Sequence, residues 1–347
     1  MSASKDQEFH FSPSECHRLL TVNAELALAY NGGDVMAWQR RLRPKLRELL
    51  GDWPRDRTDL NVQKLWCRKH ELGVITKIVF TAEPGADVPA YICIPSNVRP
   101  PYPFMICLQG HSTGMHNSIA VDRENETVPI QVDGDRDFAL ECMRRGIPAL
   151  CIEQRSFGER RELKQEKVYQ KGYCHDTFLH ALSLGRTLIG ERVFDVDRAI
   201  DYLCSWPDVD RRRIGVMGNS GGGTTSIFAA AVLDRLCFAM PSCSFGTWAG
   251  SRMALPLCEC GYVPGLLKWA EMADVMGLFA PRPVVIVAAE KDNIVPIEAA
   301  REAYQGLKAI YRAAGAEDHC HLVVGPEGHR FYADLAWPNI MAEIEHI

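Results

Sequence analysis

The spacing of apolar residues changes along the chain and divides it into three regions. In the first, residues 13–50 are predicted to be helical, because leucines recur in an alanine-rich run. Asn31-Gly32-Gly33 interrupts this run and separates off a second helix from Trp38 to Leu50. We therefore interpret residues 1–60 as an N-terminal helical extension and residues 61–347 as one catalytic domain.

The second region predicts antiparallel strands at 62–70, 73–82 and 88–95, where β-branched or alternating residues lie between turn residues. From Pro103 onward, apolar runs suited to buried strands alternate with helical patterns. The runs are 103–109, 147–153, 213–218, 237–241, 283–289 and 321–325, and the helical stretches are 138–145, 191–204, 224–236 and 298–315. Repeated strand–helix units predict an α/β fold with a mostly parallel central sheet and helices on both faces.

Three connections, 110–134, 156–190 and 242–275, are longer than the few residues that usually join such units. Long loops at strand ends commonly form lids or binding sites, so we expect these insertions to form a lid. Phe245 and Trp248 in the third insertion are candidate substrate-binding residues. Packing of these aromatic rings in the core is the open alternative.

Charge and hydropathy exclude several classes of partner. The net charge is −5, the pI is about 6.1 and no basic run stands out, so no nucleic-acid partner is expected. No apolar stretch reaches membrane-spanning length and the first residues do not resemble an export signal. We expect a cytoplasmic protein that acts on a small molecule, and a homo-oligomer is left open.

The chain has thirteen cysteines, most of them in apolar segments where a reduced thiol acts as a small hydrophobic group. Cys258 and Cys260 are separated by one residue rather than the two of a common zinc or redox pair. A metal site there with Cys243 or Cys174 is the alternative. Separately, His111 and His116 could be metal ligands, but no third ligand appears at zincin-like spacing. We expect reduced structural cysteines, no metal and no cofactor.

Candidate chemistry centres on Gly218-Asn219-Ser220-Gly221-Gly222, which fits G-x-S-x-G. The motif follows a predicted strand and precedes a predicted helix of small residues, which is the context of a nucleophile elbow. Glycines let the chain turn sharply, so that Ser220 is exposed as a nucleophile. A phosphate-binding loop is disfavoured because neither G-K-[ST] nor G-x-G-x-x-G is present.

A serine nucleophile needs a base and an acid that orients the base. Asp292 follows a predicted buried strand, and His329 follows the next one, which gives the chain order serine, acid, histidine. Glu290 is the rival acid. His319 and His321 alternate within a strand and are interpreted as packing or surface residues.

Backbone N–H groups are needed to stabilise a developing oxyanion. Gly221 at the start of the helix would supply one, and the loop after the strand at 103–109 would supply the other. His111 is the preferred donor in that loop; Ser112 is the alternative and a candidate substrate-binding residue. Arg155 is expected to hold loops near the site by charged hydrogen bonds.

These motifs resemble those of the α/β-hydrolase superfamily, in particular its acetyl xylan esterase and cephalosporin-C deacetylase-like branch. The resemblance rests on QGHSTG, EQRSFGER, GVMGNSGGG, EKDNIVPIEAAREAY and GPEGHRFYADLAW and spans roughly residues 76–340. It implies an α/β-hydrolase fold, a catalytic triad of Ser220, Asp292 and His329, and oxyanion donors at His111 and Gly221. QGH at 109–111 departs from the family's more usual HG-aromatic sequence.

The resulting hypothesis is a serine carboxylesterase that hydrolyses short acyl esters, acetyl esters of sugars or oligosaccharides above all, through an acyl-enzyme. A peptidase of the prolyl-oligopeptidase type is disfavoured because the N-terminal region is too short for a propeller. Two further hypotheses stay open on the same scaffold, a general xenobiotic esterase and a non-catalytic binding protein.

Overall fold

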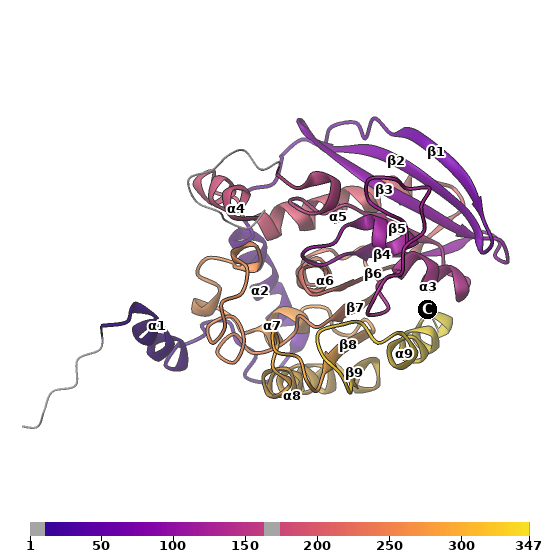
Figure 1. The fold of residues 1–347 in the computed structure, drawn as a ribbon. Coiled ribbons are helices and arrows are strands. Elements are labelled where there is room, and N and C mark those ends of the chain that lie inside the picture. Colours follow the sequence, from indigo (N-terminus) through magenta and orange to yellow (C-terminus); the bar gives the residue numbers. More distant parts are fainter. Residues whose placement is uncertain (1–10, 163–173, 347) are drawn as a thin grey trace, which may run out of the picture.

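The computed structural model describes residues 11–162 and 174–346, within which nine strands form one sheet in the order β1-β2-β3-β5-β4-β6-β7-β8-β9 (Figure 1). The strands are β1 (Gln63–His70), β2 (Gly73–Glu83), β3 (Ala86–Pro95), β4 (Tyr102–Leu108), β5 (Ala149–Ile152), β6 (Val209–Asn219), β7 (Phe238–Ser242), β8 (Val284–Ala289) and β9 (Cys320–Gly325). The β1–β2, β2–β3 and β3–β5 pairs are antiparallel and the remaining pairs are parallel. Each predicted strand is present.

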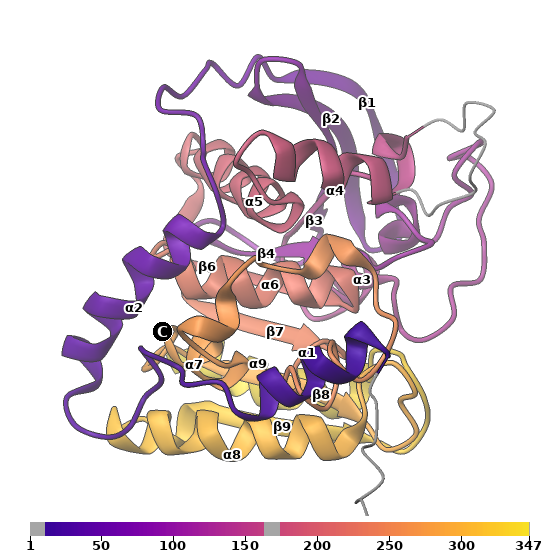
Figure 2. The ribbon, with the colours of Figure 1, turned by 90° about the vertical axis from the view of Figure 1, so that its left-hand side faces the viewer.

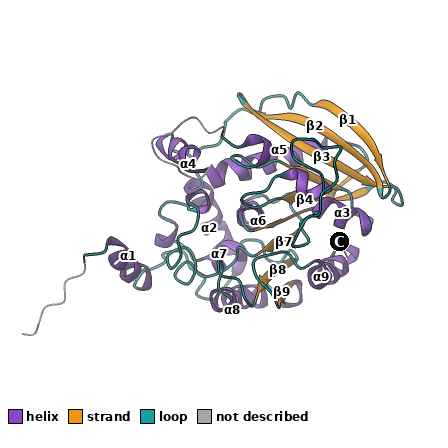
Figure 3. Cartoon of the chain, in the orientation of Figure 1, coloured by secondary structure: helices purple, strands orange, loops and turns teal. Residues whose placement is uncertain are grey.

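Helices cover both faces of the sheet, as the strand–helix alternation predicts (Figures 1 and 3). One face packs against α2 (Val35–Leu49), α5 (Leu188–Cys204), α6 (Gly221–Val232), α7 (Met272–Gly277) and α8 (Ile297–Ala313), and the other packs against α3 (Phe138–Arg144) and α9 (Ala333–His346). The remaining helices, α1 (Pro13–Val22) and α4 (Cys174–Ser183), lie outside these two layers (Figure 2).

The side chains of strand β4 contribute to the hydrophobic core on both faces of the sheet. Phe104, Ile106 and Leu108 point into the core beneath α5 and α6, whereas Met105 and Cys107 point into the core beneath α3 and α9. Side chains alternate between the two faces of a strand, so a strand covered on both sides must be apolar throughout. This explains the uninterrupted apolar run at 103–108.

The first predicted helix is shorter than expected. Helix α1 ends at Val22, and the segment that follows is held by tertiary contacts: the N–H groups of Ala27 and Leu28 donate to the carbonyls of Lys268 and Trp269 at 3.1 and 2.8 Å. A helix through these residues would use the same N–H groups internally. The helical expectation for this segment is therefore wrong.

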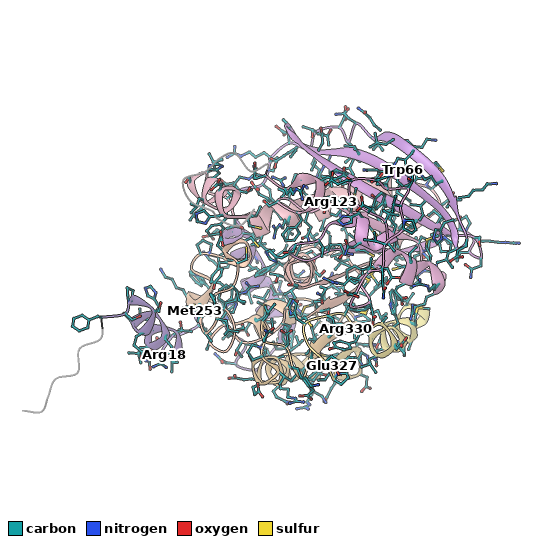
Figure 4. All side chains as sticks on the ribbon, in the orientation of Figure 1. Arg18, Trp66, Arg123, Met253, Glu327 and Arg330 are labelled. Atoms are coloured by element: carbon teal, nitrogen blue, oxygen red, sulfur yellow. The ribbon has the colours of Figure 1, made fainter. Side chains whose placement is uncertain are left out.

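The two N-terminal helices differ in packing. Helix α2 begins at Val35, three residues earlier than predicted, because the Asp34 side chain caps the N–H of Ala37 at 3.1 Å. Its residues Trp38, Leu42 and Leu46 are part of the main core. Helix α1 has no buried residue, and Arg18 on it lies away from the body of the molecule in Figure 4. The boundary predicted near residue 60 therefore does not separate two hydrophobic cores, because α2 packs into the same core as the residues after it.

The three long connections differ in the secondary structure that they contain. The connection at 110–134 contains a short 3₁₀ helix at Met115–Ile119, and the one at 242–275 contains two at Glu259–Gly261 and Leu266–Lys268. Residues 163–173 of the 156–190 insertion lie outside the described residues, so its role as a lid stays a prediction. No helix in the described part of the chain is long and apolar enough to cross a membrane.

Candidate active site

Ser220 occupies a sharp turn between β6 and α6. Its backbone has φ 58° and ψ −119°, a conformation that a non-glycine residue rarely adopts, and its N–H donates to the carbonyl of Ser242 at 2.9 Å. A Cβ atom on Gly218 or Gly222 would lie 2.6 or 2.1 Å from the carbonyl oxygen of Leu108 on β4. The glycines of the motif therefore allow the turn to lie directly against the neighbouring strand.

The turn presents Ser220 to a cavity of about 280 Å³. The cavity wall includes Ser220, Gly221, His111, Arg192, Arg252 and Cys258. Among the described residues, the Ser220 hydroxyl has no hydrogen-bond partner, so it is open to a ligand. A volume near the lower end of the range for ligand sites (about 300–1,000 Å³) suits a small group rather than a long chain.

Asp292 and His329 form a pair at the adjacent strand ends. Asp292 follows β8 and His329 follows β9, and these strands pair in parallel up to Ala289 and Gly325. The Asp292 Oδ2 and His329 Nδ1 atoms are 2.8 Å apart. The Asp292 Oδ1 atom accepts the N–H groups of Ile294 and Val295 at 2.8 and 3.0 Å, which fixes the orientation of the carboxylate.

The electrostatics of this pair favour an ionised acid. Burial of Asp292 opposes its charge, but the hydrogen bond and attraction to His329 and the two backbone N–H groups outweigh it and lower the pKa of Asp292. An ionised carboxylate accepts a hydrogen bond from the Nδ1–H group, and the tautomer that carries its proton on Nδ1 leaves Nε2 free to accept one. Nε2 of His329 is buried and has no partner within the described part of the chain, so it is available to a proton donor.

The rival acid and the two rival histidines pair with residues outside this site. Glu290 is exposed and pairs with Arg301 on α8. His319 and His321 both bond to Glu343 on α9, at 2.6 and 2.9 Å. The structure thus brings Asp292, and not Glu290, to His329. Within the described residues no hydrogen bond joins Ser220 Oγ to His329 Nε2. Catalytic hydrogen bonds are often long or poorly aligned in the absence of substrate.

The loop after β4 lies beside the nucleophile, as expected. A Cβ on Gly110 would be 3.1 Å from the Ser220 Cβ atom, and a Cβ on Gly221 would be 2.9 Å from the His111 Nδ1 atom. Gly221 is the first residue of α6, so its N–H has no acceptor within the helix and can face a ligand. Ser112 is exposed and is not part of the cavity wall.

The expected aromatic wall is not present at the cavity. Phe245 and Trp248 are only 1% and 3% exposed and belong to the main hydrophobic core. Their packing against apolar neighbours removes more ring surface from water than an open pocket would. The same insertion instead contributes Arg252, Cys258 and Cys260 to the cavity wall.

Two arginines of the site were not found from the sequence. Arg192 lies on α5 and Arg252 in the loop after β7; both are at least 91% buried and line the cavity. Arg252 donates to the Thr224 hydroxyl at 3.0 Å, and no carboxylate of the described residues pairs with it. Neither arginine is part of a motif, so its sequence neighbours carry no signal of its position.

Arg155 holds the loops near the site, as expected from sequence. Its guanidinium contacts Asp195, Glu83 and Glu191 at 2.9, 2.7 and 3.1 Å. Arg160 also contacts Asp195, at 2.6 Å. These arginines therefore join the segment after β5 to α5 and β2 and do not face the cavity.

Two groups of side chains have a composition that could hold a metal ion. One is Cys243 with Asp292 and His329, in which the last two already bond to each other. The other brings together His111, Cys174, Cys258 and Cys260. Zinc is the ion that prefers such sulfur and imidazole ligands.

Comparison with known proteins gives one relative by sequence and two solved structures with a similar fold. The Bacillus subtilis (strain 168) protein YtaP, whose hydrolase assignment is provisional, is 27% identical over 292 residues, which cover 83% of this chain and 92% of YtaP. A crystal structure from Bacteroides fragilis NCTC 9343, provisionally named an acetyl xylan esterase, has a TM-score of 0.76 at 16% identity and covers 97% of this chain and 86% of that one. A glucuronoyl esterase from Solibacter usitatus has a TM-score of 0.67 at 15% identity and covers 92% and 97%.

A family match extends over most of the chain. Residues 19–323 match the Abhydrolase family, a range that begins in α1 and ends in β9. The match includes β6, the Ser220 turn and Asp292, and it agrees with the sheet order and the helical layers described above. The chain is a hydrolase with the α/β-hydrolase fold and belongs to the Abhydrolase family.

Proposed function

We propose that the chain is a serine esterase that hydrolyses short acyl esters of carbohydrates through a covalent acyl-enzyme. The observation that carries this proposal is the strained Ser220 turn beside the Asp292–His329 pair, with a small cavity above the serine. Similar solved structures named as acetyl xylan and glucuronoyl esterases support a carbohydrate ester as the substrate.

In this mechanism His329 Nε2 takes the proton of the Ser220 hydroxyl as Oγ attacks the ester carbonyl. The carbonyl oxygen gains negative charge, which the N–H groups of Gly221 and His111 stabilise. The imidazolium then gives its proton to the departing alcohol and leaves an acyl-Ser220. Water repeats the sequence: it attacks the acyl group, His329 accepts its proton, and the carboxylic acid leaves as Ser220 Oγ regains a proton.

The size of the cavity predicts a graded preference for short acyl groups. We expect kcat/KM to decrease from p-nitrophenyl acetate to butyrate and octanoate, with a change of roughly 1–3 kcal/mol for each poorly fitting methylene. Acetylated xylo-oligosaccharides and methyl esters of glucuronate, assayed beside them, test the carbohydrate part of the proposal. A steady rise in kcat/KM toward octanoate, or no turnover of either sugar ester, would identify a general esterase instead.

Arg252 provides a second test of carbohydrate recognition. Burial lowers the pKa of its guanidinium, which has no carboxylate partner among the described residues and lies 5.5 and 5.7 Å from the ring centroids of Trp248 and Tyr262. We propose that Arg252 donates hydrogen bonds to sugar oxygens. Arg252→Met is expected to raise KM for acetylated oligosaccharides about 10-fold or more, with little change for p-nitrophenyl acetate and no loss of thermal stability. An equal effect on both substrates would show that Arg252 does not recognise the sugar.

A further inference from the structure

The four side chains of His111, Cys174, Cys258 and Cys260, here called the sulfur–histidine cluster, come from three separate parts of the chain. His111 lies in the loop after β4 and Cys174 is the first residue of α4. Cys258 directly precedes the 3₁₀ helix Glu259–Gly261, and Cys260 lies within it. Their ligand atoms all lie within 4.8 Å of one another. The cluster lies at the wall of the cavity that contains Ser220, since three of its members line that wall.

The spacing of these atoms is close to that of a zinc site. A tetrahedral Zn²⁺ with Zn–S bonds of about 2.3 Å and a Zn–N bond of about 2.0 Å holds its ligand atoms about 3.5–3.8 Å apart. His111 Nε2 and Cys260 Sγ are 3.1 Å apart, and the widest separation in the cluster is no more than 4.8 Å. Side-chain shifts of about 1 Å or less would therefore complete the tetrahedron.

The charges around the cluster point to anionic sulfur. Arg192 is 1% exposed, and its guanidinium donates to Cys260 Sγ at 3.2 Å and Cys174 Sγ at 3.4 Å. Its other acceptor is the carbonyl of Arg155, and none of the carboxylates in the described residues pairs with it. A buried guanidinium without a counter-ion is costly, and neutral thiols are weak acceptors. Thiolates would supply the missing negative charge.

We propose that the sulfur–histidine cluster binds one Zn²⁺ as a structural site. Binding displaces three thiol protons, so three thiolates, one neutral imidazole and Zn²⁺ have a net charge of −1, which Arg192 balances. All four positions of the tetrahedron are filled by protein ligands. Such a closed site contributes folding energy and leaves no position for a reacting water.

The position of the site gives it a second consequence. His111 is the proposed oxyanion donor through its backbone N–H, and its imidazole would be a zinc ligand. The metal would thus fix the loop after β4 to α4 and to the segment around Cys260. A hydrogen bond between His175 Nδ1 and Glu259 Oε1, at 2.9 Å, already joins the neighbours of the cysteine ligands. Zinc holds the site in shape, and the ester chemistry belongs to Ser220.

A zinc site replaces the expectation of no metal. In the sequence, neither Cys258 and Cys260 with a further cysteine nor His111 by itself makes a complete ligand set. The missing ligands are close in space and distant in sequence. The expectation of reduced structural thiols would still hold for buried residues such as Cys93 and Cys151 on β3 and β5.

The first test measures zinc in the wild-type protein expressed in zinc-supplemented medium and freed of loosely bound metal by gel filtration. Mass spectrometry of the metals is expected to give about one zinc per chain. Replacement by Co²⁺ should produce the thiolate charge-transfer and tetrahedral ligand-field absorption of a three-sulfur, one-nitrogen site. Less than about one tenth of a zinc per chain, with no uptake of either metal, would overturn the proposal. A disulfide between cluster cysteines, detected as a mass lower by two hydrogens, would also overturn it.

Variants then assign the ligands. Cys174→Ser and Cys258→Ser are each expected to reduce bound zinc at least 10-fold and to lower Tm. Cys237→Ser is the matched control, because Cys237 is half-buried like Cys258 and lies outside the cluster. Full zinc content in both cluster variants would contradict the assignment. Because metal content is measured without substrate, the result does not depend on the proposed esterase activity.

Discussion

Ser220→Ala is expected to abolish ester hydrolysis, with kcat reduced by about 10⁴–10⁶-fold. The nucleophile is lost, and no other hydroxyl occupies the strained turn after β6. The fold should persist, because the Ser220 hydroxyl has no partner in the described residues and the backbone bond to Ser242 remains. Hydrolysis of p-nitrophenyl acetate and the thermal unfolding midpoint, measured on the same preparation, test both statements.

A matched variant separates loss of the nucleophile from a general change in the cavity. Ser251 also lines the cavity, but its hydroxyl donates to the carbonyl of Thr247 at 2.6 Å. Ser251→Ala is expected to retain activity within a few-fold. A serine-directed organophosphonate should label the wild-type chain once, at Ser220. Labelling at another residue, or substantial activity in Ser220→Ala, would refute the assignment.

Asp292→Asn is expected to reduce kcat by about 10³–10⁴-fold while preserving the structure. The amide can keep the Oδ1 bonds to Ile294 and Val295 but would turn an N–H toward His329 Nδ1. The imidazole would then carry its proton on Nε2 and could no longer accept the proton of Ser220. Steady-state kinetics together with thermal unfolding would show a catalytic loss without unfolding.

Glu290→Gln is the control for this prediction, because Glu290 is two residues earlier and was the rival acid. Its carboxylate is exposed and pairs with Arg301, so its removal should change kcat less than a few-fold. Comparable losses in the two variants would show that proximity to β8, and not the bond to His329, explains the effect. A larger loss of kcat for Glu290→Gln would identify Glu290, and not Asp292, as the acid that orients His329.

Much of the fold was predictable because its signals are local. Strands covered on both sides must be apolar where they are covered, which identifies β4, β5, β8 and the buried second half of β6 from sequence. The Ser220 turn was predictable for a similar reason, since its glycines are required within five residues of chain. The proximity of Asp292 and His329 followed from topology, because the carboxyl ends of adjacent parallel strands meet at one edge of the sheet.

Other features depend on contacts between distant segments. The segment after α1 is held by hydrogen bonds from Ala27 and Leu28 to Lys268 and Trp269, and Phe245 and Trp248 are buried by the core that forms around them. Local patterns predicted a longer helix, and they left both a cavity wall and core packing open for the two aromatic rings. In both cases, contacts with residues far apart in the sequence determined the structure that formed.

The sequence by itself determined the sheet, the nucleophile turn and the order of serine, acid and histidine. Each of these depends on residues close together in the sequence or on the order of segments along it. Only the tertiary structure decided which side chains surround the nucleophile. It placed Arg192 and Arg252 at the cavity and brought His111 to three cysteines from two other segments. Such a cluster has no local pattern, since its members are up to 149 residues apart. Its composition is set by the packing of loops and helices around one cavity.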